Sequence, residues 1–132
     1  MKKLLLQTLL LLTFLLLAAC SDSINATPTG VTGTFQLGFS TIPDPPTRRV
    51  ETTVRIEVKD ASGKGVEGAR VELSSDMIGM SHGGPKGVLA DKGGGIYEAT
   101  GSFVMGGTWR AEVVVTKDGG SRTVGIFDFE VE

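Results

Sequence analysis

Short stretches in which apolar and polar residues alternate, separated by glycine-rich turns, constrain the fold of this chain more than any other feature. The clearest stretch runs from Thr108 to Thr116, and its alternate positions hold Trp109, Ala111, Val113 and Val115. A period of two residues is typical of a β-strand with one buried face. After the N-terminal region, no segment has the 3.6-residue period of an amphipathic helix. We therefore expect an all-β domain.

Six further segments have strand character: 34–39, 50–58, 66–73, 87–90, 96–103 and 123–131. About seven short strands with glycine-rich turns predict an immunoglobulin-like antiparallel β-sandwich. Trp109 is expected to fill the centre of its core. In the last strand the apolar positions change parity after Ile126, which predicts a β-bulge near Gly125 or Ile126.

The N-terminus has the three parts of a secretory signal. Two lysines follow Met1, a leucine-rich run extends from residue 4 to residue 17, and small residues lead to Cys20. The run is short for a membrane span. The sequence Leu-Ala-Ala-Cys that ends at Cys20 resembles the lipobox of bacterial lipoproteins, which implies cleavage before Cys20 and lipidation of its sulfur. The alternatives are an uncleaved anchor helix and a secreted chain with a free thiol; each places the domain outside the cytoplasm.

These features divide the chain into a signal peptide (1–19), a lipidated cysteine with a flexible tether (20–32) and a β-sandwich domain (33–132). Cys20 is the only cysteine, so no intramolecular disulfide can form and a hydrophobic core must stabilise the domain. Removal of Lys2 and Lys3 leaves 11 basic residues against 15 acidic ones, a net charge of −4. A mildly acidic domain without a basic cluster argues against nucleic acid as a partner.

Three methionines and the single histidine gather in two glycine-rich segments. Met77, Met80 and His82 lie in one segment, and Met105 lies in the other. If consecutive strands run antiparallel, their connections alternate between the two ends of the sandwich, and both segments fall at the same end as the proline-rich loop 43–46. Thioethers and imidazole suit a soft ion such as copper(I). A single histidine makes zinc a poor match.

The ligand set Met77, Met80, His82 and Met105 therefore predicts a copper site, with Cu(I) as the ion. Copper(II) held by His82 and oxygen donors such as Asp76 is an alternative, although it leaves the sulfurs without a role. The simpler hypothesis is that the methionines fill gaps in the core and that His82 is a solvent-exposed loop residue. That hypothesis suits a single methionine better than three near glycines, where buried positions are scarce.

Enzymatic activity is not expected. The histidine has no second group arranged as its partner, and the only thiol is at the lipid anchor. The acidic residues of the expected strands occupy outward positions.

The segment from Val54 to Trp109 resembles the YtkA-like domain, which is related to FixH-like proteins. The matching motifs are Asp60-x-Ser62-Gly63-Lys64, Val66-x-Gly68-Ala69-x-Val71, Met77-x-x-Met80-x-His82, Gly95-x-Tyr97 and Phe103-x-Met105-x-Gly107-x-Trp109. The resemblance implies an immunoglobulin-like extracytoplasmic domain, often lipid- or membrane-anchored, associated with copper handling or with assembly of copper-containing respiratory oxidases. FixH-type proteins keep a transmembrane helix, whereas this chain has a predicted lipid anchor.

The sequence thus predicts a cell-envelope lipoprotein, facing the periplasm or the exterior, that binds copper and exchanges it with a donor or acceptor protein. Delivery to a cuproenzyme such as a respiratory oxidase is the expected role. One alternative is an envelope protein-interaction module of the same fold that binds no metal. Another is an accessory factor that touches copper only through a partner.

Overall fold

The computed structural model describes residues 26–132, so the expected signal peptide, Cys20 and the first part of the expected tether lie outside the described residues. Nine β-strands make up the described part: β1 (Thr27–Thr32), β2 (Gln36–Ile42), β3 (Glu51–Lys59), β4 (Arg70–Met77), β5 (Gly87–Val88), β6 (Ala90–Gly93), β7 (Ile96–Ser102), β8 (Gly107–Lys117) and β9 (Ser121–Val131). Within residues 26–132 there is no helix of the length and apolarity needed to cross a membrane.

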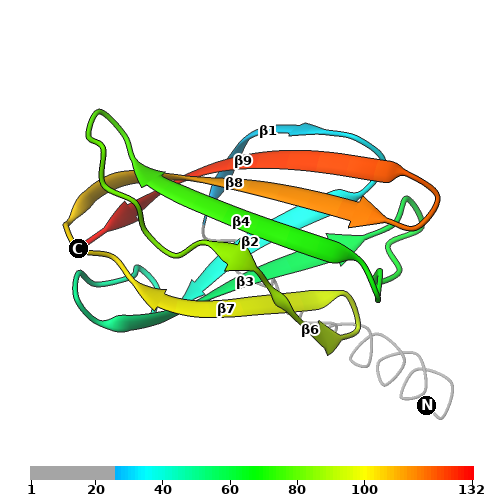
Figure 1. Cartoon of the computed structure of the whole chain (residues 1–132), viewed down its shortest axis with the longest axis horizontal. Coiled ribbons are helices and arrows are strands. Elements are labelled where there is room, and N and C mark those ends of the chain that lie inside the picture. Colours follow the sequence, from blue (N-terminus) through cyan, green and yellow to red (C-terminus); the bar gives the residue numbers. More distant parts are fainter. Residues whose placement is uncertain (1–25) are drawn as a thin grey trace, which may run out of the picture.

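The strands form two antiparallel sheets packed face to face (Figure 1). One sheet has the order β1-β9-β8-β4-β5 and the other has the order β2-β3-β7-β6. The chain passes from the first sheet to the second between β5 and β6, at the buried Leu89. The expected all-β antiparallel sandwich is confirmed, with two more strands than the sequence pattern indicates.

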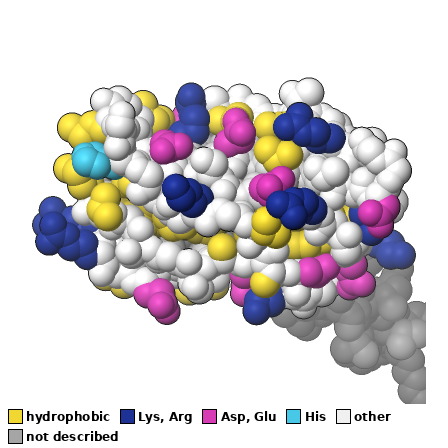
Figure 2. Space-filling view, in the orientation of Figure 1, with side chains coloured by type: hydrophobic (Ala, Val, Ile, Leu, Met, Phe, Trp, Pro, Cys, Tyr) yellow, Lys and Arg dark blue, Asp and Glu magenta, His cyan; other side chains and the backbone are white. Residues whose placement is uncertain are grey.

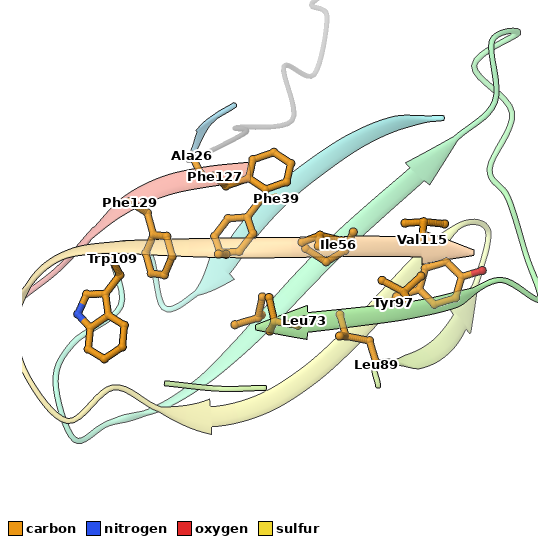
Figure 3. Close-up of a cluster of buried hydrophobic side chains, with 14 of the residues drawn as sticks. Ala26, Phe39, Ile56, Leu73, Leu89, Tyr97, Trp109, Val115, Phe127 and Phe129 are labelled. Carbon is orange, nitrogen blue, oxygen red and sulfur yellow. The ribbon is translucent and has the colours of Figure 1, made fainter. Parts of the chain in front are cut away.

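The core lies between the sheets and is built by the alternating residues (Figure 3). Phe39 packs against Phe127 and Phe129 with ring centroids 5.4 and 5.0 Å apart. Trp109 is fully buried, as its place in the alternating pattern indicates. Figure 3 shows it at one end of the core and Tyr97 at the other, so Trp109 does not fill the centre as expected.

The connections between strands gather at the two ends of the sandwich. We call one end the loop end: it holds residues 43–50, 78–86 and 103–106 and the C-terminal Glu132 (left in Figure 1). The other, the turn end, holds residues 33–35, 60–69, 94–95 and 118–120. The alternation of connections therefore brings the two methionine segments and the proline-rich loop to one end, as the strand count predicts.

The expected tether extends too far into the domain. Residues 27–32 form β1, which pairs with β9 from Thr27–Asp128 to Thr32–Val124, and Ala26 belongs to the buried core. The segment is poor in apolar residues because β1 is an edge strand, held largely by backbone hydrogen bonds to β9.

The strand expected at 66–73 begins and ends four residues later. Gly68 has a φ of 66°, which interrupts an extended backbone. The Tyr97 hydroxyl instead holds the segment: it donates to the Val66 carbonyl at 2.8 Å and accepts from the Ala69 amide at 3.0 Å. The shift makes Met77 the last residue of β4 rather than a loop residue, paired with Trp109 of β8.

The expected bulge in β9 is absent: β8 and β9 stay in register along their whole length. The irregularity lies in the neighbouring strand, between Pro28 and Gly30 of β1. Gly125 faces inward, where a Cβ would lie 2.8 Å from Leu37, and Ile126 faces outward. Because Ile126 is apolar on the outer face and Gly125 has no side chain on the inner face, the apolar alternation shifts in the sequence although the strand is regular.

Candidate metal site at the loop end

A tight turn brings Met77, Met80 and His82 together. The Met80 amide donates to the Met77 carbonyl at 3.3 Å, and Gly79 supplies the positive φ of 81° that the turn requires. The Met77 amide in turn donates to the His82 carbonyl at 3.1 Å, which closes the loop on itself. Two sulfur-bearing residues and the imidazole-bearing residue thus lie within one six-residue segment, from the last residue of β4 into the loop that follows.

The base of this loop is clamped to the core. The Ser75 hydroxyl donates to the Pro85 carbonyl at 2.5 Å, and the Gly84 amide donates to the Ser75 carbonyl at 2.8 Å. Gly84 lies so close to Trp109 that a Cβ there would come within 2.9 Å of the indole ring. The clamp positions the loop while its tip, from Ile78 to Gly83, stays exposed.

The loop that carries Met105 is tied to the same indole. Trp109 donates its indole N–H to the Met105 carbonyl at 3.1 Å. Its ring packs edge-to-face on Phe103, with centroids 5.0 Å apart. The Met77 side chain reaches toward this loop, because its terminal methyl lies 2.7 Å from the position of a Cβ on Gly107. Trp109 is therefore the residue through which both methionine segments are positioned.

The four predicted ligands differ in exposure. Met80 is 53% exposed, Met105 is 38% exposed and His82 is exposed, whereas Met77 is partly buried and packs against the core. Figure 2 shows the single histidine among apolar side chains at the loop end. Packing explains Met77 at least in part, as the gap-filling hypothesis holds, but it does not explain the exposed thioethers of Met80 and Met105.

Oxygen donors and charges border the site. A groove of about 390 Å³ runs beside the loop on the outer face of the first sheet, lined in part by Asp76, Met77 and Arg110. The guanidinium of Arg110 donates to both carboxylate oxygens of Asp128, at 2.7 and 2.8 Å. These hydrogen bonds lower the pKa of Asp128 and raise that of Arg110. Arg110 thus has its charge partner on the sheet, and Asp76 and Glu112 are the carboxylates that line the groove.

A second groove of about 390 Å³ lies under the proline-rich loop, where Thr41, Asp44 and Glu130 contribute oxygen atoms to its lining. Neither a methionine nor the histidine lines it. Across residues 26–132, no three side chains of the His, Cys, Asp and Glu types gather as a metal-binding group. Methionine is not among those four types, and its thioether is a softer donor than their oxygen and nitrogen atoms.

Sequence reasoning missed the apolar neighbours of the predicted ligands. Ile78 and Val104 are 45% and 46% exposed at the loop end, beside the methionines. Ile42 and Val50 flank the proline-rich loop and are also exposed. The signal was present in the sequence as large aliphatic residues within loops rich in glycine and proline.

The fold and this site define a class: a two-sheet antiparallel sandwich that presents thioethers and one imidazole at a single end. Within that class, the chain belongs to the YtkA-like family, whose model matches residues 35–114, more than half of the sequence. The family expected from the sequence motifs is confirmed; the relation to FixH-like proteins stays a prediction.

Among solved structures, the chain is similar to the soluble domain of PmoD from Methylocystis sp. (Rockwell). The two are 14% identical, with a TM-score of 0.53, and the match covers 85% of this chain and 100% of that domain. At this identity the likeness supports the fold alone. No curated protein matches the chain.

Proposed function

We propose that this protein is an extracytoplasmic, lipid-anchored copper(I)-binding domain that takes part in copper handling, including delivery to a cuproenzyme. The observation that carries the proposal is the exposure of Met80 and Met105 at the same end as His82, with the partly buried Met77 beside them. Soft thioethers with one imidazole favour cuprous ion over harder cations. Membership of the YtkA-like family supports it further, because the family resemblance implies copper handling.

The chemistry of the site fits exchange of copper rather than catalysis with it. Exposed thioether ligands leave the ion accessible to a donor or acceptor protein that lies in the same membrane or at its surface. Thioethers do not form disulfides outside the cell, although they oxidise to sulfoxides. The side chains Met77, Met80, His82 and Met105 would hold the ion, and Trp109 would position the two segments that carry them.

Anaerobic titration of the purified protein with copper(I), in competition with a chromophoric chelator, tests the binding. The wild type is expected to take up one equivalent with submicromolar affinity. Met80→Leu keeps an apolar side chain of similar volume but removes the sulfur, and His82→Ala removes the imidazole; both should abolish tight binding. Ile78→Ala is the matched control in the same loop and should bind as the wild type does. Weak binding that no variant alters would contradict the copper site.

A non-metal interaction module is the second candidate, favoured by the exposed Ile78 and Val104 beside the methionines. It predicts that Met80→Leu is silent, because the apolar surface persists, and that Ile78→Ala weakens association with an envelope partner. The two functions therefore give opposite results with the same two variants.

The lipid anchor has a separate test. Mass spectrometry of the protein purified from bacterial membranes should show a diacylglyceryl group on an N-terminal Cys20, with residues 1–19 removed. Cys20→Ser should leave the chain unprocessed. An unmodified thiol in the wild-type protein would contradict the anchor.

A further inference from the structure

The exposed apolar side chains of this domain are concentrated at the loop end. Eight large hydrophobic side chains are exposed in the part of the chain that the structure describes. Five of them belong to the loop end, and a sixth, Ile42, is the last residue of β2 and adjoins it. The five are Val50, Ile78, Met80, Val104 and Met105. The other two, Val31 and Val88, lie on strands of the first sheet. Figure 2 shows apolar side chains around the histidine at this end. An apolar surface gathered at one end marks a contact site.

Strand β1 begins on the side of the loop end. β1 is antiparallel to β9, and β9 ends at the loop end. The first residue of β1 is therefore the one nearest the loop end (Figure 1). Thr27 is level with Asp128, which is three residues from the end of β9 at Val131. At the rise of a β-strand those three residues span about 10 Å.

The length of chain before β1 limits which end can face a membrane. Six residues lie between Cys20 and Thr27, and at full extension the seven steps from Cys20 to Thr27 span about 24 Å. That reach exceeds the distance of about 10 Å from the level of Thr27 to the last residue of β9 at the loop end. The turn end is farther, because β9 extends seven residues, or about 23 Å, from Asp128 back to Ser121, and the turn at residues 118–120 projects beyond.

We propose that the loop end rests on the lipid bilayer that holds Cys20, with its exposed aliphatic and thioether side chains in the headgroup region. The inference rests on the lipid anchor of the proposed function but not on copper. The loop end and its border carry both signs of charge: Arg48, Arg49 and Lys86 are basic, and Asp44, Glu51 and Glu132 are acidic. Attraction to anionic lipid is therefore not the driving force; burial of apolar area together with the anchor is.

The experiment uses the full lipidated protein, reconstituted in phosphatidylcholine vesicles after mass spectrometry has verified the lipid on Cys20. Because lipidation blocks the only native thiol, single new cysteines can carry an environment-sensitive fluorophore. Val104→Cys places the label at the loop end, Asp118→Cys places it at the turn end and Val31→Cys places it on the edge strand β1. Spin-labelled lipids, which quench only fluorophores near the bilayer, report the contact.

The label at residue 104 should lose most of its emission and shift to the blue, whereas the label at residue 118 should keep its aqueous emission. Replacement of Ile78 by serine should reduce the quenching at residue 104. Neutral vesicles should suffice, and added phosphatidylglycerol should change the result little. Equal exposure of all three labels would overturn the proposal, and so would stronger quenching at residue 31 or 118. Copper(I) titration of the same sample is scored separately, so failure of the metal site and failure of membrane contact are distinguishable.

Discussion

The indole nitrogen of Trp109 lies 3.1 Å from the carbonyl oxygen of Met105 and donates its hydrogen to it. A buried core residue therefore holds the loop that carries the exposed side chain of Met105. The backbone of Trp109 pairs in register with Met77, and its ring packs against Gly84. Core packing and the placement of the predicted ligands are therefore coupled through one side chain.

Replacement of Trp109 by phenylalanine should weaken both the fold and copper binding. The change removes the hydrogen bond to Met105 and leaves a cavity against Gly84, which should lower the free energy of unfolding by about 2 to 3 kcal/mol. Urea unfolding followed by circular dichroism measures this loss. Leu73→Ala, a core change distant from Met105, is the control: it should destabilise the domain while copper(I) affinity of the folded protein is retained. If the two variants bound copper(I) with equal affinity, Trp109 would have no special part in positioning the ligands.

Met77→Leu distinguishes packing from ligation. Met77 packs on the core and its methyl approaches Gly107, so a side chain of similar volume should change the free energy of unfolding by less than about 1.5 kcal/mol. If the sulfur binds copper(I), affinity should nevertheless fall. Urea unfolding and chelator competition measure the two quantities on one sample. Unchanged affinity would leave Met77 as a packing residue, with a site of three ligands.

Tyr97→Phe should destabilise the turn end and spare the loop end. The buried hydroxyl donates to Val66 and accepts from Ala69, so its loss leaves both backbone groups without their partner, at a cost of about 1 to 3 kcal/mol. Because Trp109 and Tyr97 lie at opposite ends of the core, copper(I) affinity should not change. A parallel loss of affinity would show that the two ends are coupled.

Burial raises the pKa of Tyr97 above its usual range. Since the folded state holds the phenol proton more tightly than the unfolded state does, stability should be present below the ordinary tyrosine pKa of about 10 and be lost above it. Urea unfolding at pH 8 and at progressively higher pH measures this loss. Tyr97→Phe, which has no proton to lose, should show a shallower decline; an equal decline would assign the effect to other groups.

Asp91→Asn should reduce the loss of the free energy of unfolding at acid pH. The carboxylate of Asp91 accepts the amide of Gly68 and the amide of Gly93, each at 2.8 Å, and these bonds lower its pKa. A lowered pKa in the folded state stabilises the domain above the ordinary aspartate pKa of about 4, and that stability is lost as the pH falls through the folded value. Urea unfolding between pH 6 and pH 2 should therefore show a smaller change for the variant.

Asp60→Asn offers an independent comparison for that experiment. The Ser62 hydroxyl and the Lys64 amide lower the pKa of Asp60 in a separate turn. The two substitutions should add, because the groups do not share a partner. If neither variant changed the loss of stability at acid pH, the carboxylates responsible for that loss would lie elsewhere in the domain.

The parts of the fold that follow from alternation were predictable. The inward faces of β3 and β8 correspond to their apolar positions, and the count of antiparallel strands placed Met105 at the same end as the Met77–His82 segment. An edge strand carries little such signal, since it is held largely by backbone pairing, and β1 was therefore assigned to the tether.

Side-chain bonds to the backbone are the second source of error, because sequence patterns do not display them. The hydroxyl of Tyr97 holds residues 66–69 out of the sheet from 28 to 31 positions away along the chain. This long-range contact moved the start of β4 and turned Met77 from a loop residue into a strand residue. The sequence shows which residue types could bind the metal. It does not show that Met77 is partly buried while Met80 and Met105 are exposed, because that difference depends on where β4 ends.

The position of the C-terminus has a practical consequence. The Glu132 amide donates to Pro46, and the Arg48 amide donates to the Glu132 carbonyl, so the last residue is fastened at the end that carries the methionines. A polyhistidine purification tag appended there would bring foreign imidazoles next to Met80 and Met105 and would compete for the very ion being titrated. Samples for metal analysis should therefore be purified without one.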